Sequence, residues 1–195
     1  MSLSNACTLI RAVGAPVFFA IYFIPLWTGG DARWTSYAMI PLLACLELTD
    51  FFDGFFARRR NEVSDFGKIF DPFADVILHL TTFTCFLFSA QPASGAYLHP
   101  LLFMLIVYRE FTMMFLRMAA LKRGVAIAAR MGGKVKTVLY VASGFFALTV
   151  ETFLRNGSTG APELRTAVSC CFALCVIASY ASLADYLLRF RKQFF

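Results

Sequence analysis

The centre of the chain reads DFFDGFFARRRNEVSDFGKIFDPFAD over residues 50–75, with long apolar runs on either side. It contains two pairs of aspartates, Asp50 with Asp53 and Asp71 with Asp75, spaced three and four residues apart. On a helix these spacings place both members of a pair on one face. The basic stretch between the pairs is short, so we expect the flanking helices to be antiparallel neighbours whose four carboxylates converge.

The composition around this stretch is that of a membrane protein. Of 195 residues, 59% are hydrophobic and only 15% are charged, whereas soluble domains average about 45–50% apolar and about 25% charged residues. The formal net charge is +6. We attribute this basic excess to the cytoplasmic flanks of membrane spans, and we expect no nucleic-acid partner. The length predicts one domain over residues 1–195.

Six apolar segments are long enough to cross a bilayer, which takes about 20 residues. Their approximate ranges are 6–28, 35–57, 68–90, 98–121, 135–154 and 165–188. Basic residues gather after the second and fourth segments and in the tail, which orients those parts toward the cytoplasm. The connection between the last two segments is assigned Arg155 and Arg165, near Glu151 and Glu163. The pattern predicts an all-α bundle of six transmembrane helices with both termini cytoplasmic.

Charged residues within membrane helices are candidates for function because burying them there is costly. Four carboxylates repel one another unless a cation lies between them. An all-oxygen ligand set suits hard ions such as Mg²⁺ or Mn²⁺, and not zinc. Two such ions can bridge a pyrophosphate. The small Gly54 and Ala57 allow a bulky ligand to approach, and Arg58 can pair with phosphate oxygens.

The spacing D-x2-D-G-x2-A-R-x8-G-x3-D-x3-D resembles the signature of the CDP-alcohol phosphatidyltransferases. The residues at its fixed positions are Asp50, Asp53, Gly54, Ala57, Arg58, Gly67, Asp71 and Asp75. The resemblance implies a six-helix fold, chemistry facing the cytoplasm and, commonly, a homodimer. It implies two metal ions on the four aspartates, with Asp75 also the general base. It also implies a CDP moiety held by Asp50, Asp53, Gly54, Ala57, Arg58, Gly67 and Asp71.

Other segments are similar to phosphatidylglycerophosphate synthases, which take CDP-diacylglycerol and sn-glycerol 3-phosphate. The opening has Asn5, Thr8, Arg11 and Pro16 in the matching spacing, and the middle has Arg109-Glu110, Leu116-Arg117 and Gly133-Lys-Val-Lys-Thr137. Val76 departs from the pattern, because those synthases usually carry a lysine directly after the last aspartate.

An acceptor that bears a phosphate needs cations beyond those that hold the donor. The candidates for acceptor or phosphate binding are Arg11, Arg109, Arg117, Lys134 and Lys136. Each has a structural alternative. The two lysines can be ordinary cytoplasmic charges, Arg109 can pair with Glu110 or an aspartate, and Arg11 can pair internally.

We therefore expect an integral membrane enzyme that transfers a phosphatidyl group from a CDP-linked lipid donor to sn-glycerol 3-phosphate. If the source is a bacterium, the enzyme belongs in the cytoplasmic membrane. Alternative enzymes use serine or inositol phosphate as acceptor, or move phosphocholine or phosphoethanolamine from a CDP donor to diacylglycerol. Non-enzymatic alternatives are a membrane carrier or a scaffold whose aspartates only pair with arginines.

Overall fold

The computed structural model describes residues 3–60, 65–89, 96–124, 131–158 and 162–194, and within them the side chains of 6–49, 70–89, 96–124, 131–158 and 162–190. Every regular element in these ranges is an α-helix, which confirms the predicted all-α class. The helices are α1 (Leu3–Thr28), α2 (Arg33–Arg60), α3 (Asp65–Cys85), α4 (Pro100–Lys122), α5 (Met131–Arg155) and α6 (Pro162–Phe194).

Most helix bounds agree with the expected segments to within a few residues, but two differ more. The third segment was expected to run to residue 90, whereas α3 ends at Cys85. The chain then turns back, because Phe86 O accepts hydrogen bonds from the backbone N–H groups of both Tyr97 and Leu98. The last helix continues to Phe194, beyond the expected end at 188.

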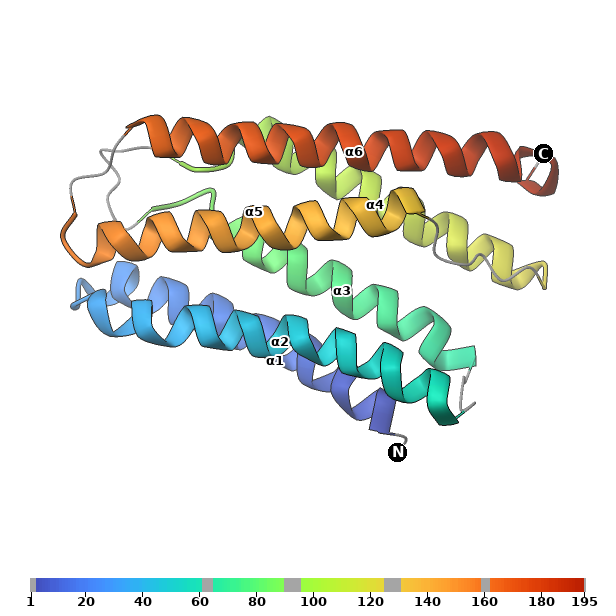
Figure 1. Ribbon diagram of the computed structural model, residues 1–195, viewed down its shortest axis with the longest axis horizontal. Coiled ribbons are helices and arrows are strands. Elements are labelled where there is room, and N and C mark those ends of the chain that lie inside the picture. The colour runs from blue at the N-terminus through green and yellow to red at the C-terminus, as the bar shows by residue number, and fades with distance from the viewer. Residues whose placement is uncertain (1–2, 61–64, 90–95, 125–130, 159–161, 195) are drawn as a thin grey trace.

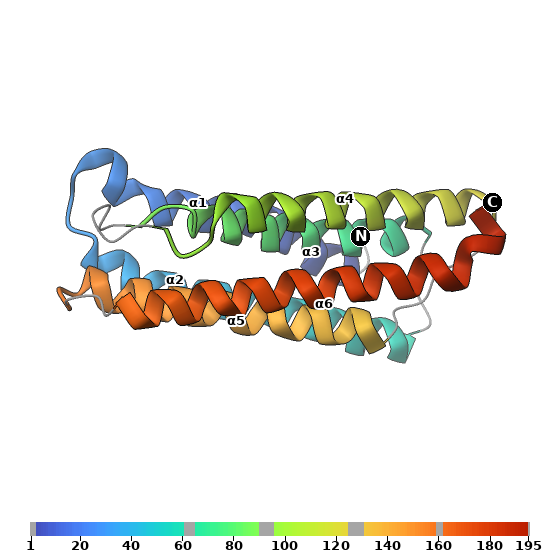
Figure 2. The same ribbon diagram turned by 90° about the horizontal axis from the view of Figure 1, so that it is seen from above.

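The helices lie side by side in an elongated bundle (Figure 1). We call the end where α2 finishes and α3 begins the aspartate end, and the opposite end the far end. The start of α1 and the finish of α6 both lie toward the aspartate end (Figures 1 and 2). As expected, α2 and α3 run antiparallel. Within the described residues, however, α1 packs against each of them more extensively than they pack against each other.

Helix ends are marked by local signals that match their backbone conformations. Gly29, Gly124 and Gly157 follow or close helices with positive φ angles of 66°, 74° and 89°, a conformation that glycine adopts without steric cost. At the start of α4, the His99 Nδ1 accepts a hydrogen bond from the Leu101 N–H at 3.1 Å, and proline occupies the first turn.

The core includes buried residues of all six helices and is rich in aromatic side chains. Phe83 of α3 meets Phe172 of α6 edge to face, with ring centroids 5.0 Å apart, and Tyr140 of α5 at 5.2 Å. Such aromatic contacts add to the burial of apolar area. They pack the last turn of α3 against α5 and α6.

Among the described residues, three helices are long and apolar enough to cross a membrane: α1 over Ala6–Thr28, α5 over Met131–Arg155 and α6 over Pro162–Phe190. The other three helices carry all four expected aspartates together with Arg58, Arg109 and Arg117, and such residues lower the apolar character of a helix.

Candidate active site

Two side-chain contacts join α1 to the second aspartate pair. Thr8 Oγ1 donates a hydrogen bond to Asp71 Oδ1 at 2.5 Å, and an Arg11 guanidinium nitrogen donates to Asp75 Oδ1. Thr8 and Arg11 are three residues apart on α1, and the aspartates are four apart on α3. Asp71 and Asp75 therefore share the face of α3 that looks toward α1, as their spacing predicts.

Arg11 and Asp75 form an ion pair of unequal exposure. The Arg11 side chain is 1% exposed, whereas that of Asp75 is 35% exposed. A buried guanidinium needs a counter-charge, because its desolvation is otherwise uncompensated. The structure thus places Arg11, one of the expected phosphate ligands, against the expected general base, and leaves that carboxylate partly accessible.

The first aspartate pair and the expected CDP ligands other than Asp71 lie outside the described side chains. Asp50, Asp53, Gly54, Ala57 and Arg58 belong to the last turns of α2. Gly67 belongs to the first turn of α3. Only their helical backbone is described. The convergence of all four carboxylates is therefore an expectation.

The described part of the expected metal site is chemically suited to a hard divalent ion. Asp71 and Asp75 offer carboxylate oxygens only, from one face of one helix, which matches the preference of Mg²⁺ and Mn²⁺. Among the described side chains no group of three or more histidine, cysteine or acidic residues comes together. A complete ligand set needs Asp50 and Asp53 of α2.

A second ionic cluster lies between α4, α5 and α6. One oxygen of Glu110, Oε1, accepts hydrogen bonds from Arg109 at 2.8 Å, Lys136 Nζ at 2.9 Å and the Tyr140 hydroxyl at 3.0 Å. Arg109 also donates from Nε to the carbonyl oxygen of Ser179, at 3.0 Å. All four members of this cationic cluster, Arg109, Glu110, Lys136 and Tyr140, are buried.

The two remaining cations expected at the acceptor differ in environment. Arg117 is half-buried on α4, and its Nε is shielded from solvent without a hydrogen-bond partner among the described residues. Lys134 is exposed in the first turns of α5. The structure thus ties Arg109 and Lys136 to Glu110, while Arg117 carries an unsatisfied buried donor.

His79 connects the aspartate helix to the cationic cluster. It lies one turn beyond Asp75 and is buried, as expected for a packed histidine. Its ring meets that of Tyr140 edge to face at 5.6 Å, and its Nε2 lies 3.5 Å from Glu47 Oε1 of α2. Because Tyr140 also binds Glu110, the rings of His79 and Tyr140 link the aspartate helix to the buried cations.

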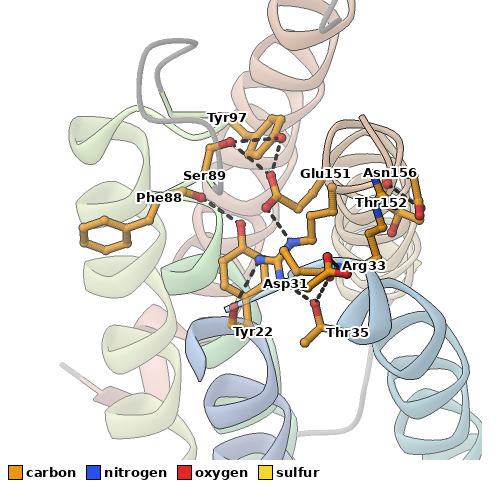
Figure 3. A network of polar contacts seen from close by, with 12 residues as sticks. Tyr22, Asp31, Arg33, Thr35, Phe88, Ser89, Tyr97, Glu151, Thr152 and Asn156 are labelled. Carbon is orange, nitrogen blue, oxygen red and sulfur yellow. Dashed lines mark hydrogen bonds and ion pairs between the residues drawn. The ribbon is translucent and has the colours of Figure 1, made fainter. Parts of the chain in front are cut away.

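A third polar network occupies the far end (Figure 3). Glu151 accepts hydrogen bonds from Arg155 Nε at 2.7 Å, from Ser89 Oγ at 3.1 Å and from the Tyr97 hydroxyl. Arg155 also donates to Thr35 Oγ1 at 2.7 Å, and Arg165 donates to Ser89 at 3.0 Å. Burial, and then the charge of Glu151, raise the pKa of Tyr97 above its ordinary value, so the phenol is a hydrogen-bond donor.

This network corrects one sequence interpretation. Arg155 and Arg165 were assigned to a connecting loop near Glu151, whereas all three side chains are buried. They bond to one another or to groups on α1, α2 and the α3–α4 connection. The interpretation was wrong because these charged residues lie at the ends of apolar segments. At such positions the sequence does not distinguish an exposed loop residue from a member of a buried ion pair.

Sequence reasoning also assigned no role to Thr8, and it saw Glu110 only as a possible partner of Arg109. Thr8 carried a usable signal, since a hydroxyl residue three positions before a buried arginine presents both groups on one helix face. Glu110 has no comparable signal, because its partners Lys136 and Tyr140 lie 26 and 30 residues away.

These features define the class of the protein. It is an integral membrane protein with helices of membrane length, and it has a carboxylate pair on one helix and a buried cationic cluster that can bind charged groups. The chain belongs to the CDP-alcohol phosphatidyltransferase family, whose sequence model matches residues 1–181. It is accordingly a membrane transferase of phospholipid biosynthesis.

Relatives of known name lie within the same family. The chain is 34% identical over 199 residues to the CDP-diacylglycerol–glycerol-3-phosphate 3-phosphatidyltransferase of Treponema pallidum, with 97% of this chain and 89% of the relative covered. It is 32% identical to the Bacillus subtilis protein of the same name, over 70% of each chain. It is 35% identical to a probable phosphatidylglycerophosphate synthase of Mycobacterium tuberculosis, over 77% of this chain and 68% of the relative.

Proposed function

We propose that the protein transfers the phosphatidyl group of CDP-diacylglycerol to sn-glycerol 3-phosphate and releases CMP. The observation that carries this proposal is the adjacency of two sites. The acidic face of α3 and the buried cations of α4 and α5 are linked by two contacts, that of the His79 ring with the Tyr140 ring and that of the Tyr140 hydroxyl with Glu110. A charged donor and a phosphorylated acceptor need such an arrangement, and the names of the relatives support this pair of substrates.

The donor belongs at the aspartate end. Asp50, Asp53, Asp71 and Asp75 would hold two Mg²⁺ or Mn²⁺ ions, with Gly54, Ala57, Arg58 and Gly67 around the CDP moiety. When bound, the metals supply neutralising charge for the pyrophosphate and for the departing CMP. Thr8 fixes Asp71 by its hydrogen bond, so α1 sets the position of that carboxylate.

Asp75 acts as the general base. It is the partly accessible member of its ion pair, so an acceptor hydroxyl can reach it, while Arg11 holds its Oδ1 in place. The hydroxyl proton passes to the carboxylate as the oxygen attacks phosphorus, and the bond between that phosphorus and the CMP oxygen breaks. Proton transfer to a positioned base contributes about 10²–10⁴-fold to a rate.

The acceptor phosphate belongs beside the cationic cluster. Arg109 and Lys136 carry two positive charges against the one negative charge of Glu110, which leaves a formal excess of +1 (2 − 1) in a buried place. Arg117 adds an unsatisfied buried donor, and Lys134 is exposed where a soluble acceptor arrives. A phosphate monoester can neutralise the excess positive charge and accept hydrogen bonds from these donors.

We further propose that all six helices cross the membrane, with both termini and the aspartate end in the cytoplasm, and that the protein is a homodimer. The basic connections that follow α2 and α4 support this orientation. A water-soluble acceptor and a lipid donor meet at such an interface.

The test is CMP release by purified protein with CDP-diacylglycerol, Mg²⁺ or Mn²⁺, and one acceptor at a time. We expect release with glycerol 3-phosphate and loss of release when the metal is chelated. Release with serine or inositol phosphate instead, or only with CDP-choline and diacylglycerol, would replace the proposed substrates and retain the family. Folded protein that releases no CMP under any of these conditions would contradict the enzymatic proposal.

A further inference from the structure

Glu110 stands where three elements meet. Its Oε1 accepts from a residue of its own helix, Arg109, and from two residues of α5, Lys136 and Tyr140, at 2.8–3.0 Å. Arg109 in turn reaches the backbone of α6 through the Ser179 carbonyl. The single carboxylate therefore sets the distance between two cations that come from different helices.

These contacts place both cations with little freedom to move. Glu110 is 3% exposed, Arg109 is 4% exposed and Lys136 is 8% exposed. Lys136 also lies over the Tyr140 ring, with Nζ 4.4 Å from its centroid. Long cationic side chains otherwise lose considerable rotamer freedom when they bind a ligand. Here that freedom is already restricted by contacts that exist before a ligand arrives.

The charges of the cationic cluster do not cancel. Among the described side chains, two cations share one carboxylate, and Arg117, two turns after Glu110 on the same helix, has no hydrogen-bond partner for its Nε. A buried excess of positive charge is unfavourable unless an anion compensates it. An incoming phosphate monoester provides that anion, whereas an uncharged alcohol does not.

We propose that Glu110 is a positioning residue that holds Arg109 and Lys136 for the acceptor phosphate, and thereby sets the preference for phosphorylated over unphosphorylated acceptors. This inference rests on the proposed function, since it assumes a phosphorylated acceptor. Glu110 itself does not bind the substrate. It acts through the two cations that it orients.

The test is Glu110→Gln, assayed in the full-length membrane enzyme with glycerol 3-phosphate and with glycerol. Glutamine has the same shape but removes the charge-assisted bonds that hold both cations. We expect the KM for glycerol 3-phosphate to rise about tenfold or more, since bonds to charged groups are the strong ones. The ratio of kcat/KM for glycerol 3-phosphate over glycerol should fall by a similar factor, while the KM for CDP-diacylglycerol stays unchanged.

The matched control is Glu151→Gln. Glu151 is also buried, also on one of these helices and also bound to an arginine, but it lies in the far-end network. The same chemical change there should lower thermal stability and leave acceptor selectivity unchanged. An equal loss of selectivity in both variants would mean that selectivity follows general stability, and would overturn the inference.

A second variant with a milder change serves as the test if Glu110→Gln does not fold. Tyr140→Phe removes one of the three donors to Oε1 without altering any charge, and we expect a shift of selectivity in the same direction, by about threefold. Wild-type selectivity in folded Glu110→Gln, or in Tyr140→Phe where that is the only folded variant, would overturn the role of Glu110 alone. Wild-type enzyme that does not distinguish the two acceptors would instead overturn the proposed acceptor, and this inference with it.

Discussion

Asp75 combines two properties that a general base needs, a fixed position and access for the acceptor. Its carboxylate is held by a guanidinium that is itself buried, yet about a third of the side chain is exposed. Asp71, one turn earlier, is held by a hydroxyl instead of a cation. The two aspartates of this pair therefore have different surroundings among the described side chains.

Asp75→Asn should abolish turnover without unfolding the protein. Asparagine retains an oxygen that can accept from Arg11 but cannot take the hydroxyl proton, so we expect kcat to fall by about 10²–10⁴-fold. The measurement is kcat together with the thermal unfolding midpoint in detergent. The control is Asp185→Asn, whose partner Arg189 is 62% exposed, because such surface pairs contribute little. Substantial residual activity in Asp75→Asn would exclude this aspartate as the base.

Arg117→Ala should act on the acceptor. Its Nε has no partner among the described residues, so removing it costs little in the empty enzyme and more once a phosphate is bound. We expect the KM for glycerol 3-phosphate to rise about tenfold, with a small change in the KM for the donor. Lys122→Ala, an exposed cation at the end of the same helix, is the control. A change confined to the donor would reassign Arg117 to the CDP side.

At the scale of elements, α1 is the helix on which the site is assembled. It packs against both α2 and α3, and it supplies Thr8 and Arg11 to the aspartates of α3. Gly14, one turn after Arg11, lies against Leu46 of α2, and a Cβ atom at this position would overlap the Leu46 side chain. The close approach of α2 to α1 therefore depends on the absence of a side chain at Gly14.

Gly14→Ala should lower stability because Leu46 is itself buried and has little room to move. Overpacking of this kind costs about 1–3 kcal/mol, which we expect to see as a lower thermal unfolding midpoint in detergent. Gly133→Ala is the control, since outside its own helix turn and chain neighbours no described atom lies within 4 Å of an added Cβ. Addition of Leu46→Ala should restore part of the loss. An unchanged midpoint in Gly14→Ala would show that the interface between α1 and α2 is looser than described.

At the scale of the whole molecule, the two ends of the bundle differ in kind. The far end is joined by direct bonds among Glu151, Arg155, Arg165 and their partners on α1, α2 and the α3–α4 connection (Figure 3). The aspartate end carries the carboxylate pair and the termini (Figure 1). This division is consistent with a protein whose far end holds the helices together and whose aspartate end binds substrates.

Fusion reporters at two positions test the proposed orientation. Green fluorescent protein after Phe195 should fluoresce, and alkaline phosphatase at the same place should be inactive, because that end is expected in the cytoplasm. A fusion at Gly157, at the far end, should show the reverse pattern. Activity of both phosphatase fusions would contradict six crossings, and an exchanged pattern would invert the protein in the membrane.

The sequence alone determined the class, the helices and the aspartate pairs. Apolar length, helical periodicity and the spacing of charged residues are local properties, so they can be read along the chain without knowledge of its contacts. The same reasoning found Arg11, Arg109, Arg117, Lys134 and Lys136 as cations of interest, because charge within an apolar segment is visible locally.

Only the tertiary structure decided which partner each charge has. Arg11 meets an aspartate 64 residues away, Lys136 meets a glutamate 26 residues away, and Arg155 reaches a threonine 120 residues away. A buried ion must be compensated by whatever group the packing of helices brings within a few ångströms. That group depends on how α1, α4, α5 and α6 are arranged in space, and this arrangement leaves no mark in the spacing of residues along the chain.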